Sequence, residues 1–155
     1  MSNCERLIKE VTGWYQNLHK QGQGAPNVFS GVCPDRQQFL CLLTPLGLDR
    51  RDRLDFMRVV LKRENCHTFA HSLWVMRDDG IECIDIYAGE SGEYWGYELA
   101  IEEGGLRLIN ELKTDTPAIF FQELLPQHQT ESINDEQRLL SVWEEAKPRI
   151  FWKKW

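Results

Sequence analysis

The sequence predicts one α+β domain, spanning residues 1–155, in which three helices cover one face of a mainly antiparallel sheet of five or six strands. Short segments of alternating apolar and polar residues are separated by tight-turn dipeptides, as in antiparallel strands. Three longer segments repeat apolar residues three and four positions apart, as amphipathic helices do. The chain length suits one ordinary domain, and no linker divides it.

The first helix is expected to begin at Ser2 and to end near Gly22. Ser2 and Glu5 have the spacing of a capping box, in which each side chain satisfies a backbone N–H of the first turn. The apolar residues that follow lie on one stripe: Leu7, Ile8, Val11, Trp14, Tyr15 and Leu18. We expect this stripe to pack on the sheet of its own chain, and a homodimer formed through it is the alternative.

The next segment is predicted to form a hairpin and a second helix. Residues 27–33 and 38–43 are rich in Val, Phe and Leu and flank a turn at 34–37. Asp49 can then cap a helix that runs to about Glu64. The apolar side of this helix consists of Leu54, Met57, Val60 and Leu61, and its outer side carries Arg51, Arg58 and Lys62. We interpret the basic row as a solvated surface, with anion binding as the alternative.

Residues 66–103 are predicted to form three consecutive antiparallel strands. Asp79 and Gly80 favour a tight hairpin turn, because both positions tolerate positive φ. A second turn is expected at 89–92. The three strands are expected over 66–76, 81–88 and 93–101.

A two-residue turn at Asp79-Gly80 would place Trp74 opposite Asp85. One sheet face then carries the candidate binding residues, which are Ser72, Trp74, Asp85, Tyr87, Tyr94 and Glu98. The other face is apolar, with Phe69, Leu73, Val75, Ile84, Ile86, Trp95, Tyr97 and Leu99. A three-residue turn with Gly80 as a bulge would instead bring His71 next to Tyr87, since a shift of one residue moves a whole strand to the other face.

The leading functional hypothesis is a non-enzymatic accessory or regulatory protein, of the small type found in bacteria and their mobile elements. It would bind another protein through the candidate face, because large aromatic residues anchor interfaces and carboxylates select basic partners. The alternative is a small hydrolase or lyase. Asp85 and Glu98 are expected to lie diagonally on neighbouring strands, ~7 Å apart, a separation that general acid and base catalysis can use.

A metal site containing His67 or His71 is a second form of the enzyme hypothesis. Two histidines four residues apart share one face of a helix, but on a strand they are ~13 Å apart. Because this segment is predicted to be a strand, we expect neither a metal site nor a cofactor.

The net charge of −6 is unevenly distributed, since residues 77–136 contain 15 Asp and Glu but only three Lys and Arg. Such an acidic segment repels phosphate backbones and disfavours nucleic acid as a partner. No apolar run reaches the ~20 residues of a membrane span, and the first residues lack a signal-peptide pattern. We therefore expect a cytoplasmic protein whose partner is a protein with a basic surface, not a membrane.

The five cysteines, Cys4, Cys33, Cys41, Cys66 and Cys83, never occur in a Cys-x-x-Cys pair, so we expect buried, reduced thiols.

The C-terminal third is expected to contain one strand, one helix and a basic aromatic tail. Residues 106–109 suit a fourth strand, and 118–125 suit a short helix or a strand equally well. The last helix is expected from Ser132 to just before Pro148. The tail, 149–155, is expected to fold back onto the acidic sheet.

Overall fold

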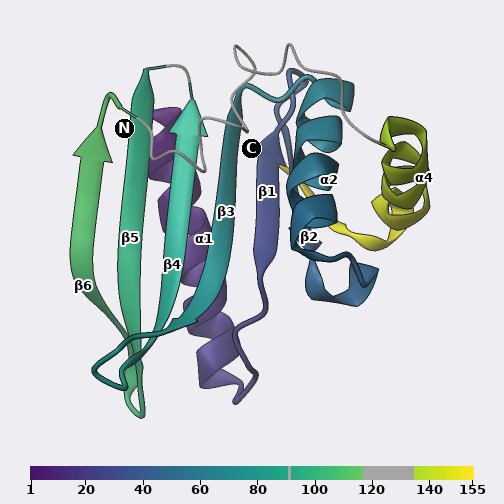
Figure 1. Cartoon of the computed structure of the whole chain (residues 1–155). Helices are drawn as coiled ribbons and strands as arrows, with labels where there is room; N and C mark the ends of the chain where they lie inside the picture. The colour runs from purple at the N-terminus through teal and green to yellow at the C-terminus, as the bar shows by residue number, and fades with distance from the viewer. Residues whose placement is uncertain (91, 117–134) are drawn as a thin grey trace.

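Seven antiparallel strands form one sheet in the computed structural model, which describes residues 1–90, 92–116 and 135–155 (Figure 1). The strands are β1 (Val28–Val32), β2 (Gln37–Leu42), β3 (Thr68–Met76), β4 (Glu82–Glu90), β5 (Glu93–Glu102), β6 (Gly105–Thr114) and β7 (Phe151–Lys154). Their order across the sheet is β6-β5-β4-β3-β1-β2-β7. The predicted α+β class with a mainly antiparallel sheet is therefore confirmed, with more strands than expected.

The described helices lie on both faces of the sheet. They are α1 (Asn3–Lys20), α2 (Arg50–Arg63) and α4 (Glu136–Ala146), with short 3₁₀ turns at Thr44–Leu46 and Lys147–Arg149. In Figure 1, α1 lies behind the strands and α2 lies in front of them. We call the α1 side the back face and the α2 side the front face. The prediction that three helices cover one face was wrong, because the sheet presents apolar side chains on both faces.

The back face is buried under α1. Ser2 caps this helix as predicted, since its Oγ accepts a hydrogen bond from the Glu5 N–H at 3.1 Å. The apolar stripe of α1 packs on its own sheet, which confirms that prediction. The main members of this cluster are Leu7, Ile8, Val11, Tyr15, Ile84, Ile86, Trp95, Tyr97 and Leu99. Full burial of each aliphatic side chain contributes about 1.5–3 kcal/mol.

The front face is covered at β1 and β2 by α2 and α4. Asp49 caps α2 as predicted, accepting from the Asp52 N–H at 2.8 Å. The cluster beneath includes Phe29, Phe39, Phe56, Met57, Val60, Phe69 and Trp143. The Phe39 and Trp143 rings lie 5.2 Å apart between centroids, so α4 is fixed to the sheet by aromatic packing.

The predicted solvated row on α2 is wrong at one position. Arg58 is only 5% exposed and its guanidinium lies 3.3 Å from the Asp55 carboxylate, which is also buried. Arg51 reaches the same carboxylate from the surface at 3.4 Å. A buried guanidinium needs such a partner, because an unpaired buried charge is strongly destabilising.

The C-terminal tail forms the edge strand β7. It pairs with β2, and the Trp155 N–H donates to the Arg36 carbonyl oxygen at 2.8 Å. The Trp155 ring lies 4.3 Å beneath the Arg6 guanidinium carbon, a cation–π contact. The tail thus folds back onto its own chain as predicted, but at the sheet edge opposite the acidic strands.

Two predictions fall outside the described residues: the helix or strand at 118–125 and the helix start at Ser132. The described part of the last helix begins at Glu136 and passes into the 3₁₀ turn that contains Pro148. Within the described ranges, no helix has the length and apolar character needed to cross a membrane.

Candidate functional site

The turn between β3 and β4 decides which side chains share a face. The Arg77 N–H donates to the Ile81 carbonyl oxygen, and the Gly80 N–H donates to the Arg77 carbonyl oxygen, both at 2.9 Å. Gly80 has φ 84°, a left-handed conformation that favours glycine. The loop therefore has three residues, 78–80, and the two-residue turn predicted from the sequence was wrong. The alternative with a bulge at Gly80 is the one observed.

This extra residue moves β3 by one position relative to β4. Leu73 pairs with Asp85, Trp74 with Ile84, and His71 with Tyr87. Ser72 and Trp74 therefore lie on the back face, whereas Asp85 and Tyr87 lie on the front. The predicted face that combined all six candidate residues does not exist.

After the turn between β4 and β5, the side chains of β5 point to the faces that the sequence predicted, but they pair with different residues of β4. Glu90 pairs with Glu93, so Glu98 lies directly opposite Asp85 and Gly96 opposite Tyr87. The sequence predicted a diagonal relation between the two carboxylates. In the structure they are a direct cross-strand pair, and directly opposed side chains have their Cβ atoms only about 4.5–5.5 Å apart.

Ser72 is a structural residue that fastens α1 to the sheet. Its side chain is fully buried, and its Oγ accepts from the Val28 N–H at 3.0 Å. The hydroxyls of Ser72 and Tyr15 are hydrogen-bonded, and Tyr15 also donates to the Pro26 carbonyl oxygen. No partner can reach Ser72 without unpacking α1.

Trp74 is accessible but belongs to a different surface. It is 46% exposed on the back face, near the turn end of β3, and its indole N–H donates to Glu82 at 2.7 Å. Met76 and Ile81 are exposed at the same end of the hairpin. Trp74 therefore cannot act together with Asp85.

Tyr94 lies on the front face but is buried. It is 6% exposed and belongs to the cluster under α2 and α4. Three of the six predicted residues, Asp85, Tyr87 and Glu98, therefore remain together on an accessible surface.

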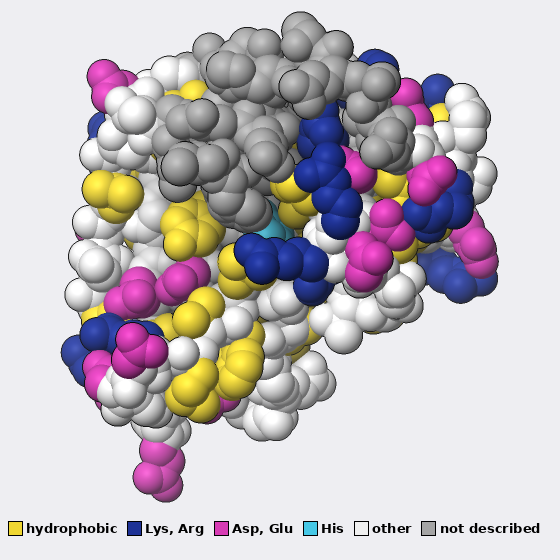
Figure 2. All heavy atoms as spheres, in the orientation of Figure 1, with side chains coloured by type: hydrophobic (Ala, Val, Ile, Leu, Met, Phe, Trp, Pro, Cys, Tyr) yellow, Lys and Arg dark blue, Asp and Glu magenta, His cyan; other side chains and the backbone are white. Residues whose placement is uncertain are grey.

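These three residues line a small concavity, which we call the acidic notch. Its volume is about 140 Å³, and its lining consists of Asp85, Tyr87, Gly96, Tyr97, Glu98, Asn110 and Leu112. Gly96 lies between the Tyr87 ring and Leu112. A Cβ on Gly96 would contact both of these side chains, so the absence of a side chain here leaves the notch open. Figure 2 shows acidic side chains bordered by hydrophobic ones on this part of the front face.

The two carboxylates of the notch differ in their partners. Glu98 accepts from Arg77 Nη1 at 3.0 Å, and the same guanidinium contacts Asp79 at 3.2 Å. Asp85 has a buried oxygen, Oδ1, that receives no hydrogen bond from the described residues. Burial and the Glu98 charge raise the pKa of Asp85, and the Arg77 charge opposes this in part.

Tyr87 closes one side of the notch. It is half-buried, and its pKa is raised by burial and then by the charges of Asp85 and Glu98. The phenol therefore stays protonated at neutral pH and presents an aromatic wall with a polar tip. Cross-strand from it, His71 is buried, and burial with the Arg53 charge lowers the pKa of His71 to about 4. The imidazole is neutral at pH 7.

The histidines do not form a metal site with their described neighbours. His67 Nδ1 lies 2.8 Å from the Thr68 hydroxyl, whereas His71 is part of the buried sheet. Among residues 1–90, 92–116 and 135–155, no three His, Cys, Asp or Glu side chains are grouped to hold a metal ion. The notch itself offers two carboxylates, which suit a basic side chain better than a transition metal.

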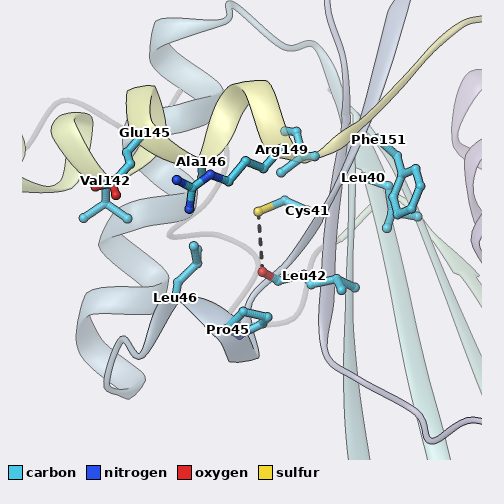
Figure 3. A pocket seen from close by; sticks show the side chains of 11 residues that line it. Leu40, Cys41, Leu42, Pro45, Leu46, Val142, Glu145, Ala146, Arg149 and Phe151 are labelled. Atoms are coloured by element: carbon cyan, nitrogen blue, oxygen red, sulfur yellow. Dashed lines mark hydrogen bonds between the residues drawn. The ribbon is translucent and has the colours of Figure 1, made fainter.

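A larger cavity of about 370 Å³ lies between β2, the Thr44–Leu46 turn and the end of α4 (Figure 3). Its walls are mainly apolar, including Leu40, Leu46, Val142 and Phe151, and Glu145 and Arg149 are its charged members. Glu145 and Arg149 are of opposite charge, so the described lining offers no pair of carboxyl groups like that of the notch.

Sequence reasoning missed Arg77, Gly96, Asn110 and Leu112. Arg77 reaches the notch because it directly precedes the 78–80 loop, and the other three depend on the pairing of β5 with β6. The only local signal was Gly96 within a strand, which often marks a place where another group approaches closely.

The chain matches no family model, no curated protein and no solved structure.

Proposed function

We propose that the protein is a small binding module whose acidic notch accepts a basic side chain of a partner protein. The observation that carries this proposal is the Asp85 carboxylate, which lies opposite Glu98 and has a buried oxygen that receives no hydrogen bond from the part of the chain that the structure describes. A buried acceptor without a donor costs about 1–3 kcal/mol or more when charged. A lysine or arginine of a partner that docks on the exposed part of Asp85 would reduce this cost by compensating the charge of the carboxylate.

The chain itself provides an example of the contact. Arg77 already places a guanidinium on Glu98, so the geometry at this position is suited to a planar cation. One guanidinium faces three carboxyl groups here, because Arg77 contacts Asp79 and Glu98, and Asp85 lies opposite Glu98. The Tyr87 ring beside them supplies an aromatic surface for a cation–π contact.

The surroundings favour a single basic side chain over a broad basic surface. Arg53 on α2 is close enough to lower the pKa of His71, and Arg107 on β6 is exposed and paired with Glu102. The Arg53 charge acts on His71, which pairs with Tyr87 of the notch, and like charge disfavours a uniformly basic partner. A partner that inserts one lysine or arginine and covers Leu112, which is 59% exposed, fits this pattern best.

A second candidate, an acid–base hydrolase or lyase, is favoured by the same pair of carboxylates. Asp85, whose pKa is raised, lies opposite Glu98, which accepts a hydrogen bond from Arg77, and two carboxyl groups in such different environments can divide the roles of acid–base catalysis. Wild-type protein acting this way would release nitrophenol from nitrophenyl esters or glycosides, and Asp85→Asn would not. If the wild type releases no nitrophenol at any pH between the ordinary pKa values of aspartate and tyrosine, this candidate is excluded.

The binding proposal is tested by fluorescence anisotropy with a labelled glycine-rich peptide that contains a single arginine. Asp85→Asn and Glu98→Gln should each weaken binding by about tenfold, the effect of a charge-assisted hydrogen bond of ~1.5 kcal/mol. Glu111→Gln is the matched control, because Glu111 is an exposed acid on neighbouring β6 that pairs with Tyr97 on the back face. A labelled glutamate–glycine peptide controls for nonspecific contact.

Equal loss of binding in Glu111→Gln and Asp85→Asn would show attraction by net charge alone and would contradict the proposal. Trp74→Ala provides a further control. Because Trp74 lies on the back face, this variant should bind as the wild type does.

A further inference from the structure

Two cysteines meet at the end of the front-face cluster, away from the acidic notch. Cys33 follows β1, and Cys66 precedes β3. These strands are antiparallel neighbours in which Val32 pairs with Thr68, so the chain positions of both thiols lie at the same end of the strand pair. Both side chains are buried in the cluster under α2 and α4.

Gly31 allows this close approach. A Cβ on Gly31 would stand 3.0 Å from Cys66 Sγ and 2.7 Å from the Phe39 ring, too close for any larger residue without movement. Gly31 and Cys33 are two residues apart in an extended segment and therefore face the same side. Cys66 Sγ therefore lies on the same face of this segment as the Cys33 side chain.

The fold also fixes Cys66 from the other direction. Asn65, two residues after the end of α2, has a left-handed conformation with φ 52°, and the Cys66 backbone N–H donates to the Leu61 carbonyl oxygen at 3.0 Å. This helix ending is of the type in which the last carbonyl groups are capped by the following backbone. The backbone of Cys66 is therefore held at the end of α2.

Cys33 faces an open depression of about 740 Å³ whose lining includes Asp35, Glu64, Lys147 and Trp152. Lys147 lies 2.6 Å from Glu64 and its charge also acts on Cys33. Cys33 is therefore the member of the pair that lines the depression, and Cys66 is not part of its lining.

The two thiols are electronically unequal. A hydrogen bond from Cys66 lowers the pKa of Cys33, and the Lys147 charge adds to this against burial, Glu64 and Asp35. The same interaction, with burial, raises the pKa of Cys66. The thiolate is the reactive form of cysteine, and Cys33 is also the thiol that lines the depression, so both observations favour Cys33 as the nucleophile of the pair. By contrast, burial raises the pKa of Cys4 and raises that of Cys41 to about 12.

We propose that Cys33 and Cys66 form a peroxide-sensitive thiol pair, in which Cys33 is oxidised first and Cys66 resolves it to a disulfide.

The chemistry is balanced with one hydroperoxide as the oxidant. The Cys33 thiolate attacks one oxygen of hydrogen peroxide, the S–O bond forms as the O–O bond breaks, and water leaves after protonation. Cys33 becomes a neutral sulfenic acid, which removes the negative charge that opposes ionisation of Cys66. Cys66 then attacks the Cys33 sulfur, the S–S bond forms, and the oxygen leaves as a second water with the Cys66 proton.

The test is mass spectrometry of the full chain after exposure to hydrogen peroxide. Wild-type protein should lose about 2 Da, the two thiol hydrogens, and proteolysis should give one linked peptide pair containing Cys33 and Cys66. Cys66→Ser should stop at a Cys33 sulfenic acid that dimedone traps. Cys33→Ser should react much more slowly at all four remaining thiols.

Lys147→Gln sharpens the test without touching either thiol. Removal of this charge leaves Glu64 near Cys33, so oxidation should slow by roughly twofold to fivefold, the effect of one partly exposed charge. Lys20→Gln at the distant end of α1 is the matched control and should leave the rate unchanged.

Differential alkylation of the wild-type chain keeps the proposal falsifiable if a cysteine variant does not fold. Iodoacetamide applied before denaturation should label Cys33 ahead of the other four cysteines. Preferential labelling or oxidation of Cys4, Cys41 or Cys83, or oxidation of Cys33 without a link to Cys66, would overturn it.

Discussion

The two faces of β4 and β5 differ in burial and in charge. On the back face, Ile84, Ile86 and Leu99 are buried under α1. On the front face, the intervening Asp85, Tyr87 and Glu98 remain partly exposed and line the acidic notch. Adjacent residues in a strand thus serve a hydrophobic core on one side and a charged surface on the other.

This difference shows that alternation along a strand is easier to predict than pairing between strands. Within β4 and β5 the expected common face of Asp85, Tyr87 and Glu98 is correct, because each strand has a strict period of two. The error came from one residue in the 78–80 loop, which moved Ser72 and Trp74 to the other face. Any experiment that contrasts the two faces therefore tests the account.

The largest expected contrast concerns stability. Ile86→Ala on the back face should lower the free energy of unfolding by about 2–5 kcal/mol, because Ile86 is fully buried and its truncation leaves a cavity. Leu112→Ala on the front face is the control and should change it by less than about 0.5 kcal/mol. Urea denaturation measures both, and similar losses would mean that the front face is covered as firmly as the back.

A smaller loss of stability is expected when the buried hydrogen bonds of Ser72 are removed. Ser72→Ala should lower the free energy of unfolding by about 1–3 kcal/mol, because the Val28 N–H loses its acceptor in a buried site. It should leave binding of the arginine peptide unchanged. Ser141→Ala, on the exposed side of α4, is the control with little expected change. A Ser72→Ala variant that keeps full stability but loses binding would support the face originally predicted from the sequence.

The third prediction concerns the contribution of Asp85 to the pH dependence of the free energy of unfolding. Its pKa is raised in the folded chain, so between the ordinary carboxyl pKa and the raised value the native state binds more protons than the unfolded state. Its contribution to stability is therefore present at low pH and is lost as pH rises through the raised pKa. Asp85→Asn should remove this loss and gain about 0.2–1 kcal/mol at neutral pH, the size of cross-strand pair effects.

Thermal or urea unfolding of the wild type and Asp85→Asn across acid to neutral pH measures this difference. Glu111→Gln, which removes an exposed acid from the opposite face, is the matched control. A gap between Asp85→Asn and wild type that widens toward acid pH would contradict the assigned sign.

The sequence predicted the features that depend on local chemistry. Ser2 and Asp49 cap their helices as expected, and the apolar stripe of α1 packs on the sheet. The sequence could not show which face each helix covers, since an amphipathic pattern fixes the buried side of a helix but not its partner. The positions of Asn110 and Leu112 at the notch depend on the register shift between Glu98 and Leu99 in the pairing of β5 with β6. The thiol pair was missed for the same reason, because Cys33 and Cys66 meet only through the pairing of β1 with β3.

The most direct test of the central claim is an amide chemical-shift titration of isotope-labelled wild-type protein with N-acetyl-arginine amide. The account predicts that the amides of Asp85, Tyr87, Gly96 and Glu98 shift together and saturably, with N-acetyl-glutamate amide producing no such change. Shifts confined to Trp74, Glu82 and their neighbours on the back face, or spread evenly over all exposed acids, would contradict it.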